Sequence, residues 1–284
     1  MTSKKLCADT DWHELWQDMM RKCFAIAYDE TGRLKQWSVS QAKDYLQHCN
    51  AEYSQALIDL TAVTAAESVL DIGCGPGVLS LPFSKFVKTV TAVDSAPGML
   101  EVLCENAQAQ NLRNIVCVNK FWRDIRVGMD INIEYDVVIS SNSISLLGVR
   151  EQTINDTASQ DWNLVDAVTK INQVGKRVYV TFRLSGDNDS EMFKLLGREY
   201  HPHPNHIILY NLLYQMGICP NFQIMAFANQ RANDSAGLLK WLDWIAKFNS
   251  EEKETILKHY AQNKRKLPDT PELWGIFWWR NTNH

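Results

Sequence analysis

The chain has 284 residues, of which 45% are hydrophobic, and its formal net charge at pH 7 is −4. This apolar fraction excludes disorder of the whole chain, and the slightly acidic balance gives no broad basic field for a nucleic acid. At about 150 residues per domain, the length predicts one or two domains. The polar first residues and the lack of a long apolar run predict a cytoplasmic protein with no membrane association.

Seven cysteines are scattered along the chain, with no Cys-x-x-Cys pair among them. Buried free thiols account for such a distribution, so no disulfide framework is expected.

Two helical stretches are predicted before the first strand, because apolar residues recur at helical spacing over residues 11–20 and 40–60. Together they would form an N-terminal cover. The connection over residues 28–37 is predicted either to close over a bound ligand or to be a solvated link packed by Trp37. The first alternative makes Trp37 a candidate substrate contact.

Residues 68–72 form a short apolar run bounded by glycine, which is typical of a strand buried on both faces of a parallel sheet. Gly73, Gly75 and Gly77 follow at alternate positions, so the chain can turn tightly and a ligand can lie against bare backbone. Pro76 suits the first turn of a following helix, whose free amides and positive dipole end would point at the ligand.

A second strand is predicted over residues 90–93, and Asp94 stands at its carboxyl end. Asp94 follows the glycines by about 20 residues, the position from which a carboxylate accepts both hydroxyls of a ribose. A ligand that contains a nucleoside is therefore expected. Val78 stands where a dinucleotide fold has its third glycine, which argues against a pyrophosphate at this turn.

The order Asp71-x-Gly-x-Gly-x-Gly77, with Asp94 after the next strand, resembles the first motif of class I S-adenosylmethionine-dependent methyltransferases. The resemblance spans about residues 66–184 and implies S-adenosyl-L-methionine as cofactor and S-adenosyl-L-homocysteine as product. It also implies an α/β fold with a doubly wound, mostly parallel seven-stranded sheet and an antiparallel last strand. The cofactor-binding residues that it implies in the first two loops are Asp71, Gly73, Cys74, Gly75, Gly77, Asp94, Ser95 and Met99.

Family members often carry an aspartate for the adenine amino group after the third strand, here predicted over residues 114–118. Asn119 and Lys120 stand at that place and Asp124 comes late, so this contact is in doubt. Phe121 and Trp122 are predicted to flank the adenine by stacking, with the alternative that Trp122 belongs to the core.

The fourth strand, residues 135–140, resembles the family's strand beneath the transferred methyl group, which implies that Ser140 touches the cofactor and Asn142 the substrate. The Asn-Pro-Pro-Tyr-type loop of base-modifying members is absent after this strand. A small-molecule acceptor is therefore expected, and a nucleic acid is not. Residues 176–183 are the predicted fifth strand.

Histidines at three positions follow the fifth strand, within a segment where family members commonly insert acceptor-binding helices. His201, His203 and His206 are candidate catalytic bases, with a solvated helix entry as the alternative. A metal is not expected, because Pro202 and Pro204 prevent the helical spacing of many two-histidine sites.

The next helix is predicted to contribute acceptor contacts, because three polar or aromatic residues lie about one turn apart on it. A buried amide amid apolar residues would need a hydrogen-bond partner, which favours a position facing a pocket. These residues are Tyr210, Asn211 and Tyr214.

Four parts are thus predicted. Residues 1–65 are the helical cover, 66–184 the cofactor-binding core, 185–219 the acceptor-binding insertion, and 220–284 the rest of the sheet with a further helical insertion. In that last part, strands are expected over residues 221–228 and 275–280, and helices over 238–248 and 251–266.

The function implied is methyl transfer to a small molecule by in-line displacement, for which the protein supplies mainly alignment and desolvation. Two alternatives stay open: a nicotinamide-dinucleotide-dependent oxidoreductase and a non-catalytic nucleoside-binding protein. The acceptor atom, the need for a general base and the oligomeric state are left open by the sequence.

Overall fold

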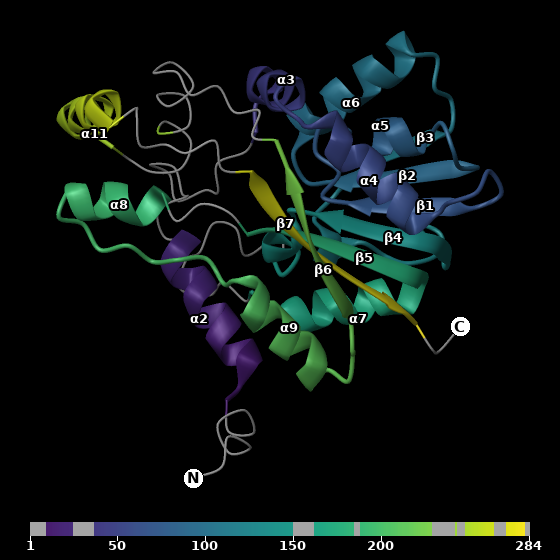
Figure 1. Ribbon diagram of the computed structural model, residues 1–284. Helices are drawn as coiled ribbons and strands as arrows, with labels where there is room; N and C mark the ends of the chain where they lie inside the picture. The colour runs from purple at the N-terminus through teal and green to yellow at the C-terminus, as the bar shows by residue number, and fades with distance from the viewer. Residues whose placement is uncertain are drawn as a thin grey trace.

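A computed structural model describes residues 10–24, 37–149, 162–184, 188–228, 242, 248–263 and 271–281. Its centre is a seven-stranded sheet in the order β3-β2-β1-β4-β5-β7-β6, with helices on both faces (Figure 1). Six strands share one direction, and β7 runs antiparallel to both of its neighbours. The predicted fold class is therefore confirmed.

The sheet has its topological switch point between β1 (Ser68–Ile72) and β4 (Tyr135–Ser141), because β2 (Thr89–Asp94) pairs on the other side of β1. Ligands of open α/β sheets bind outside the carboxyl ends of the strands at such a point. The glycine-rich turn follows β1 directly, so it lies at this edge. The remaining strands are β3 (Ile115–Asn119), β5 (Gly175–Arg183), β6 (Asn221–Phe227) and β7 (Glu272–Arg280).

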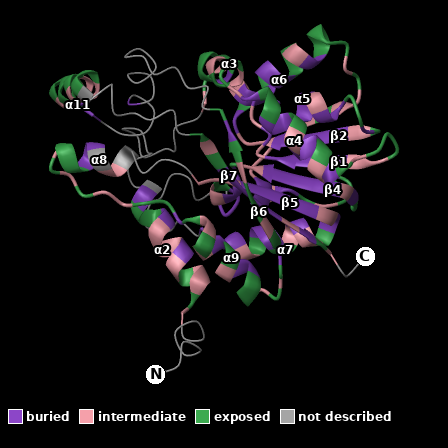
Figure 2. Cartoon of the chain, in the orientation of Figure 1, coloured by how far each residue is buried: buried purple, intermediate pink, exposed green. Residues whose placement is uncertain are grey.

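Alternate strand residues contribute to two cores on opposite faces of the sheet, and the central strands are largely buried (Figure 2). Leu70, Ile72 and Val138 pack on one face with α2 (Trp12–Phe24), α7 (Leu164–Val174) and α9 (His206–Gln215). Val69 and Val137 pack on the other face with α4 (Ala51–Thr61) and α5 (Ser80–Phe83). Both faces of the central strands are therefore covered, as their near-continuous apolar runs predict.

The single helical stretch expected over residues 40–60 is divided into two helices. It forms α3 (Val39–Gln47) and α4, separated at His48 to Asn50. Asn50 is the reason, because its side-chain oxygen accepts the Glu52 N–H at 2.8 Å and so caps a new helix. The break lets α3 pack on α6 (Pro97–Ala109) while α4 packs on the sheet.

The helix after the glycine-rich turn is also shorter than expected, because α5 spans only Ser80–Phe83. Pro82 has no N–H for the Val78 carbonyl, and the Ser54 hydroxyl donates to that carbonyl instead, at 3.0 Å. A single turn sums few peptide dipoles. The expected regular helix is therefore reduced to one turn, and the peptide dipole that it can offer at its start is correspondingly small.

A smaller apolar cluster lies apart from the sheet. It joins α8 (Asn188–Leu195) to α11 (Ser250–Asn263), with Leu242 and Phe248 between them. Asn249 caps α11, since its side chain accepts the Glu252 N–H at 2.9 Å. Most of the helix predicted over residues 238–248 lies outside the described residues.

Two short 3₁₀ turns complete the described elements, η1 (Trp122–Asp124) and η2 (Ile144–Leu146). None of the helices in the described ranges is both long and apolar enough to cross a lipid bilayer.

The N-terminal helix α2 should contribute strongly to stability, because Trp16 is 0% exposed within the larger core. Trp16→Ala should lower the free energy of unfolding by about 3 to 5 kcal/mol, the cost of a large cavity. Asp18→Ala, which removes only an exposed ion pair with Lys22 on the same helix, should cost at most about 0.5 kcal/mol. Urea unfolding followed by circular dichroism measures both, and equal stabilities would show that α2 does not dock.

Candidate functional site

The glycine-rich turn has a left-handed backbone at its three glycines, with φ of +71° at Gly73, +54° at Gly75 and +95° at Gly77. A Cβ on Gly73 would lie 2.3 Å from the Ser143 Cβ, and one on Gly77 would lie 2.4 Å from a Leu103 methyl. Both glycines are therefore required by packing. A Cβ on Gly75 would meet only the Met99 sulfur, at 3.9 Å, so Gly75 is the glycine that offers open space to a ligand.

Asp94 joins this turn to the loop after β2. One carboxylate oxygen accepts the Gly75 N–H at 2.9 Å, and the other accepts the Ala96 N–H at 2.8 Å. Burial raises the pKa of Asp94, and the backbone donors oppose that rise by stabilising the anion. Each carboxylate oxygen has further lone pairs, so Asp94 retains acceptor capacity for ligand hydroxyls.

Asp71 lies beneath the turn, with a relative exposure of 2%. The Ser80 hydroxyl donates to its carboxylate at 2.6 Å. Burial raises the pKa of Asp71 to about 7, and the negative charge of Asp94 adds to the rise. Asp71 therefore anchors α5 to β1, and its contact with the amino group of the cofactor stays a prediction.

The polar residues at the end of β4 and just after it lie in two environments, because Ser140 and Ser143 are buried and Asn142 is exposed. The Ser140 and Ser143 hydroxyls lie 2.9 Å apart, and Ser143 donates to the Ile72 carbonyl at 2.7 Å. Both are buried, so Ser140 supports the turn from below. Asn142 is exposed with φ of +51°, and its N–H donates to the Thr181 carbonyl at 3.1 Å. Its side chain is thus at the surface, at the carboxyl end of β4.

Three hydroxyls that the sequence analysis did not single out as a group meet at the same edge of the sheet. Tyr53 Oη lies 2.5 Å from Ser141 Oγ and 2.6 Å from Thr181 Oγ1, and Thr181 donates to Ser141 at 3.1 Å. Burial raises the pKa of Tyr53. The inward stripe of α4 predicts that Tyr53 is buried, but no local pattern links it to residues 88 and 128 positions away.

Met99 and Ser95 occupy the segment predicted beside the adenosine. Met99 is buried and its sulfur faces Gly75, while Ser95 is half-buried. Cys74 is buried against Leu81 and Leu103 of the neighbouring helices. Trp37 packs on this segment as well, beside Ala96 and Met99, which matches the packed-link alternative for this residue. Residues 28–36 of its predicted loop lie outside the described residues.

Trp122 does not flank an adenine. It is 3% exposed, its indole N–H donates to the Ala167 carbonyl at 3.0 Å, and the Lys170 ammonium lies 5.5 Å from its ring centroid. The stacking prediction for this residue was wrong, and its core alternative holds. Phe121 is half-buried and packs against the same core.

The three histidines occupy three different environments. His203 Nδ1 lies 3.3 Å from the Cys23 sulfur, and the His206 ring stacks on Phe222 with centroids 5.7 Å apart. His201 lies 3.9 Å from the Glu199 carboxylate. Over the ranges that the structure describes, no group of three or more His, Cys, Asp or Glu side chains is arranged to hold a metal ion.

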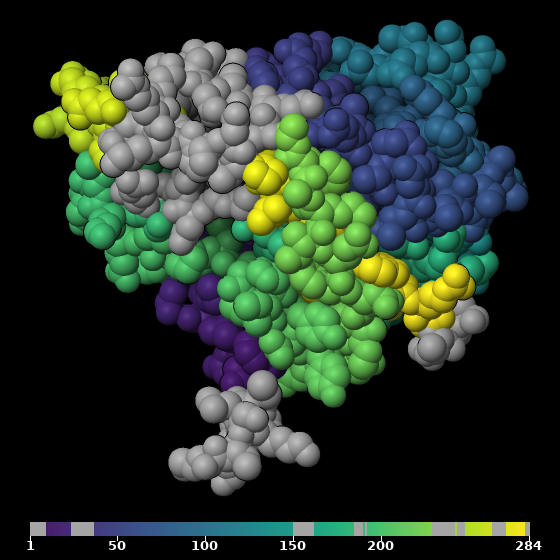
Figure 3. Space-filling model, viewed as in Figure 1, coloured from purple at the N-terminus to yellow at the C-terminus, as the bar shows by residue number. Residues whose placement is uncertain are grey.

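The contact between Cys23 and His203 joins the end of α2 to the segment before α9, and the two helices lie side by side (Figure 3). The Cys23 thiol donates to the Met20 carbonyl at 3.4 Å, so its sulfur is available to accept Nδ1–H. The His203 residue is exposed overall. Its imidazole is nevertheless largely surrounded by protein, and this burial lowers the pKa of His203. The lowered pKa favours the neutral imidazole, and its tautomer decides whether Nδ1 or the Cys23 sulfur is the donor in their contact.

The residues of α9 that are predicted acceptor contacts differ in how far the protein covers them, and their contact with an acceptor stays a prediction. Tyr214 is 63% exposed and Tyr210 37% exposed, whereas Leu209 and Leu212 face the core. Asn211 satisfies its amide by donating to the Ile207 carbonyl one turn earlier, at 2.8 Å. The apolar stripe of α9 takes the inward face, and the Tyr210 ring lies beside it, with its centroid 6.3 Å from that of Phe277.

Comparisons with known proteins agree with this arrangement. A family model described as a methyltransferase domain matches residues 69–159. An uncharacterized protein of Haemophilus influenzae is 28% identical over 237 residues, which cover 80% of this chain and 81% of that protein. The 23S rRNA (uracil(1939)-C(5))-methyltransferase RlmD of Pseudomonas fluorescens is 34% identical over 88 residues, but these cover only 28% of this chain and 19% of the enzyme.

Solved structures share the fold. The YcgJ protein of Bacillus subtilis superposes with a TM-score of 0.53 at 14% identity, covering 81% of this chain and 97% of that one. The phosphoethanolamine N-methyltransferase 2 of Haemonchus contortus, solved with phosphomonomethylethanolamine and S-adenosylhomocysteine, gives 0.50 at 15% identity and covers 86% of this chain and 57% of that one. Together with the glycine-rich turn and the strand order, these findings show that residues 69–159 match a methyltransferase domain and that the chain has the fold of solved methyltransferases.

Proposed function

We propose that this enzyme transfers the methyl group of S-adenosylmethionine to a small-molecule acceptor. The observation that best supports the cofactor site is the hydrogen bond from the Gly75 N–H to the Asp94 carboxylate. Gly75 also has open space where a Cβ would lie. Gly73, Gly77 and Met99 shape the walls of this site, and Asn142 lies at the acceptor side. Bound S-adenosylmethionine would supply an activated methyl group on its sulfonium.

Charge and coverage favour a small acceptor over a nucleic acid. The net charge of −4 gives no general attraction for a polyanion. The similarity to the rRNA enzyme extends over only 19% of that protein, so most of it has no counterpart in the match. The Haemonchus enzyme, which shares the fold, was solved with a small phosphorylated amine.

The residues of this chain would act mainly by alignment and by exclusion of water. Alignment of two reactants can lower a barrier by about 7 to 11 kcal/mol in well-oriented systems. Three hydroxyls form a hydrogen-bonded polar cluster at the carboxyl ends of β4 and β5. They belong to Tyr53, Ser141 and Thr181. The raised pKa of Tyr53 keeps its phenol protonated, so it would not serve as a base.

His203 is the candidate general base that the geometry favours for a hydroxyl acceptor. A helix that connects parallel strands runs back along the sheet, so the start of α9 lies toward the carboxyl ends of the strands. His203 precedes this start, and Cys23 orients its ring. His206 is engaged in stacking on Phe222 instead.

Asp94→Ala should lower the affinity for S-adenosylhomocysteine at least tenfold, because charge-assisted hydrogen bonds to the ribose, worth about 1.5 to 3 kcal/mol each, would be lost. Asp59→Ala, on the exposed side of α4, is the matched control and should bind as the wild type does. Calorimetry measures both, with circular dichroism to establish folding. Unchanged affinity in a folded Asp94→Ala protein would place the ribose elsewhere.

The acceptor class is tested directly with S-adenosylmethionine labelled in its methyl group. An extract of the source organism is separated into a small-molecule ultrafiltrate, an RNA fraction and a protein fraction, and each is incubated with the enzyme. We expect the label in the ultrafiltrate, and Asp94→Ala should abolish the transfer. Label that enters only RNA or only protein would contradict the small-molecule proposal without affecting the family assignment.

His203→Ala should reduce turnover with that acceptor by about 100-fold or more if the acceptor is a hydroxyl. Its affinity for S-adenosylhomocysteine should stay within about 1 kcal/mol of the wild type, the scale of an indirect effect. His201→Ala and His206→Ala are the controls and should keep most of the turnover. A wild-type rate in His203→Ala would assign the histidines to a structural connection.

A further inference from the structure

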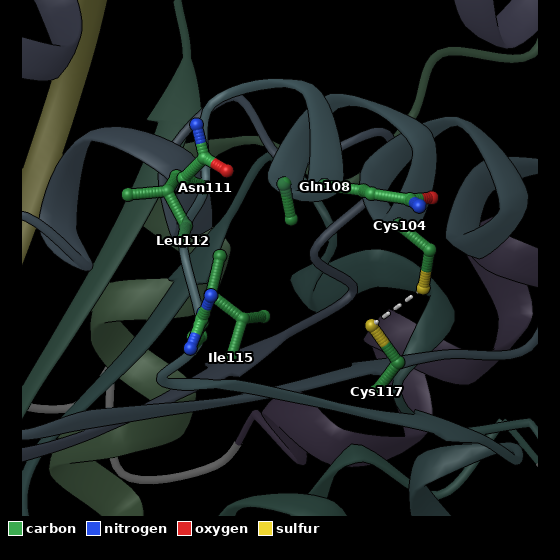
Figure 4. Close-up of a pocket in the computed structure, with 8 residues that line it drawn as sticks. Cys104, Gln108, Asn111, Leu112, Ile115 and Cys117 are labelled. Carbon is green, nitrogen blue, oxygen red and sulfur yellow. Dashed lines mark hydrogen bonds between the residues drawn. The ribbon is translucent and has the colours of Figure 1, made fainter.

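A cavity of about 370 Å³ lies between α6 and β3, and it is not part of the glycine-rich turn (Figure 4). Two cysteines stand together in its wall, Cys104 on α6 and Cys117 on β3, and Figure 4 shows their sulfur atoms facing one another. The other lining residues are Ala107, Gln108, Asn111, Leu112, Arg113 and Ile115. The methyl-transfer site uses none of them.

The two sulfur atoms are 3.2 Å apart, with the Cys104 thiol donating to Cys117. A disulfide has an S–S length of about 2.05 Å, so the atoms need to approach by only about 1 Å. Cys104 is exposed and Cys117 is half-buried, which leaves the pair open to a reagent from the Cys104 side. Cys23 and Cys74, in contrast, are buried.

We propose that Cys104 and Cys117 form a modification site at which a low-molecular-weight disulfide, such as oxidised glutathione, is reduced and the protein gains an intramolecular disulfide. The Cys104 thiolate attacks one sulfur of the small disulfide, whose S–S bond breaks, and the first small thiol leaves with the proton that Cys104 lost. The Cys117 thiolate then attacks the Cys104 sulfur, the bond between that sulfur and the small molecule breaks, and the second small thiol leaves with the proton that Cys117 lost. Two electrons pass from the protein to the small disulfide, which ends as two thiols.

The surroundings of the two thiols set this order of attack. Burial raises the pKa of Cys117 to about 12, and the neighbouring Cys104 adds to the rise, so Cys117 is a poor first nucleophile. Once Cys104 carries the small thiol, its own charge and hydrogen bond no longer oppose ionisation of Cys117. The cavity beside Cys104 offers amide and guanidinium donors on Gln108, Asn111 and Arg113, which suit a ligand with carboxylates.

The experiment uses the full-length protein, reduced, freed of reductant and incubated with oxidised glutathione. Free thiols are then alkylated and the peptides mapped by mass spectrometry. We expect the Cys104 and Cys117 peptides to be joined, with no glutathione on either, and dithiothreitol to restore both thiols. Closure of the pair should be at least tenfold faster than glutathione addition to Cys219, an exposed cysteine elsewhere in the chain.

Single variants separate the two steps. Cys117→Ser should stop at one glutathione on Cys104, Cys104→Ser should leave Cys117 reduced over the same time, and Cys219→Ser should close the pair as the wild type does. The proposal is overturned if glutathione on Cys104 persists in the wild-type protein, or if Cys104 reacts no faster than Cys219. Cofactor binding by each variant, measured in parallel, establishes that the proteins are folded.

Discussion

The two hydrogen bonds that Asp94 accepts from Gly75 and Ala96 hold together the two loops on which the cofactor site depends. The loops follow neighbouring parallel strands, β1 and β2, and the Gly73 and Cys74 N–H groups also donate to the Val93 carbonyl, at 2.8 and 3.1 Å. One carboxylate fixes the direction of the Gly75 N–H and the start of α6. Met99 then faces Gly75 across the space that a Cβ would begin to fill. Because Asp94 holds both loops, the shape of the site is set before a ligand arrives.

Asp71 is buried beneath the glycine-rich turn, and the pKa of its carboxyl makes the stability of the folded chain depend on pH. The pKa of Asp71 in the folded chain, about 7, is above its ordinary value of 3.8. The folded state therefore holds this proton more tightly than the unfolded state, and the resulting stability is present below pH 3.8 and lost as the pH rises toward 7. Above neutral pH a buried carboxylate remains, which a cationic ligand near the turn would stabilise.

The sequence predicted the sheet well, because the central strands are short and rich in apolar residues and Asp94 follows the glycines at the expected offset. It failed where side chains compete with a regular helix. Asn50 caps a new helix inside an amphipathic stretch, and Pro82 shortens the helix after the turn. Trp122 was ambiguous because an aromatic residue after β3 satisfies either a core or a ligand pattern, and only the position of α7 decides between them.

The proposed acceptor side depends on contacts between distant segments, so no local motif describes it. Tyr53 meets Ser141 and Thr181, and Cys23 meets His203 from 180 positions away, because α2 and α4 pack on opposite faces of one sheet. The Tyr53 contacts come from α4 on one face of the sheet, and the contact between Cys23 and His203 comes from α2 on the other face. The cofactor loops are held by hydrogen bonds over about 20 positions, within one strand-turn-strand unit. The cofactor can therefore be inferred from a short motif, whereas the acceptor requires the whole fold.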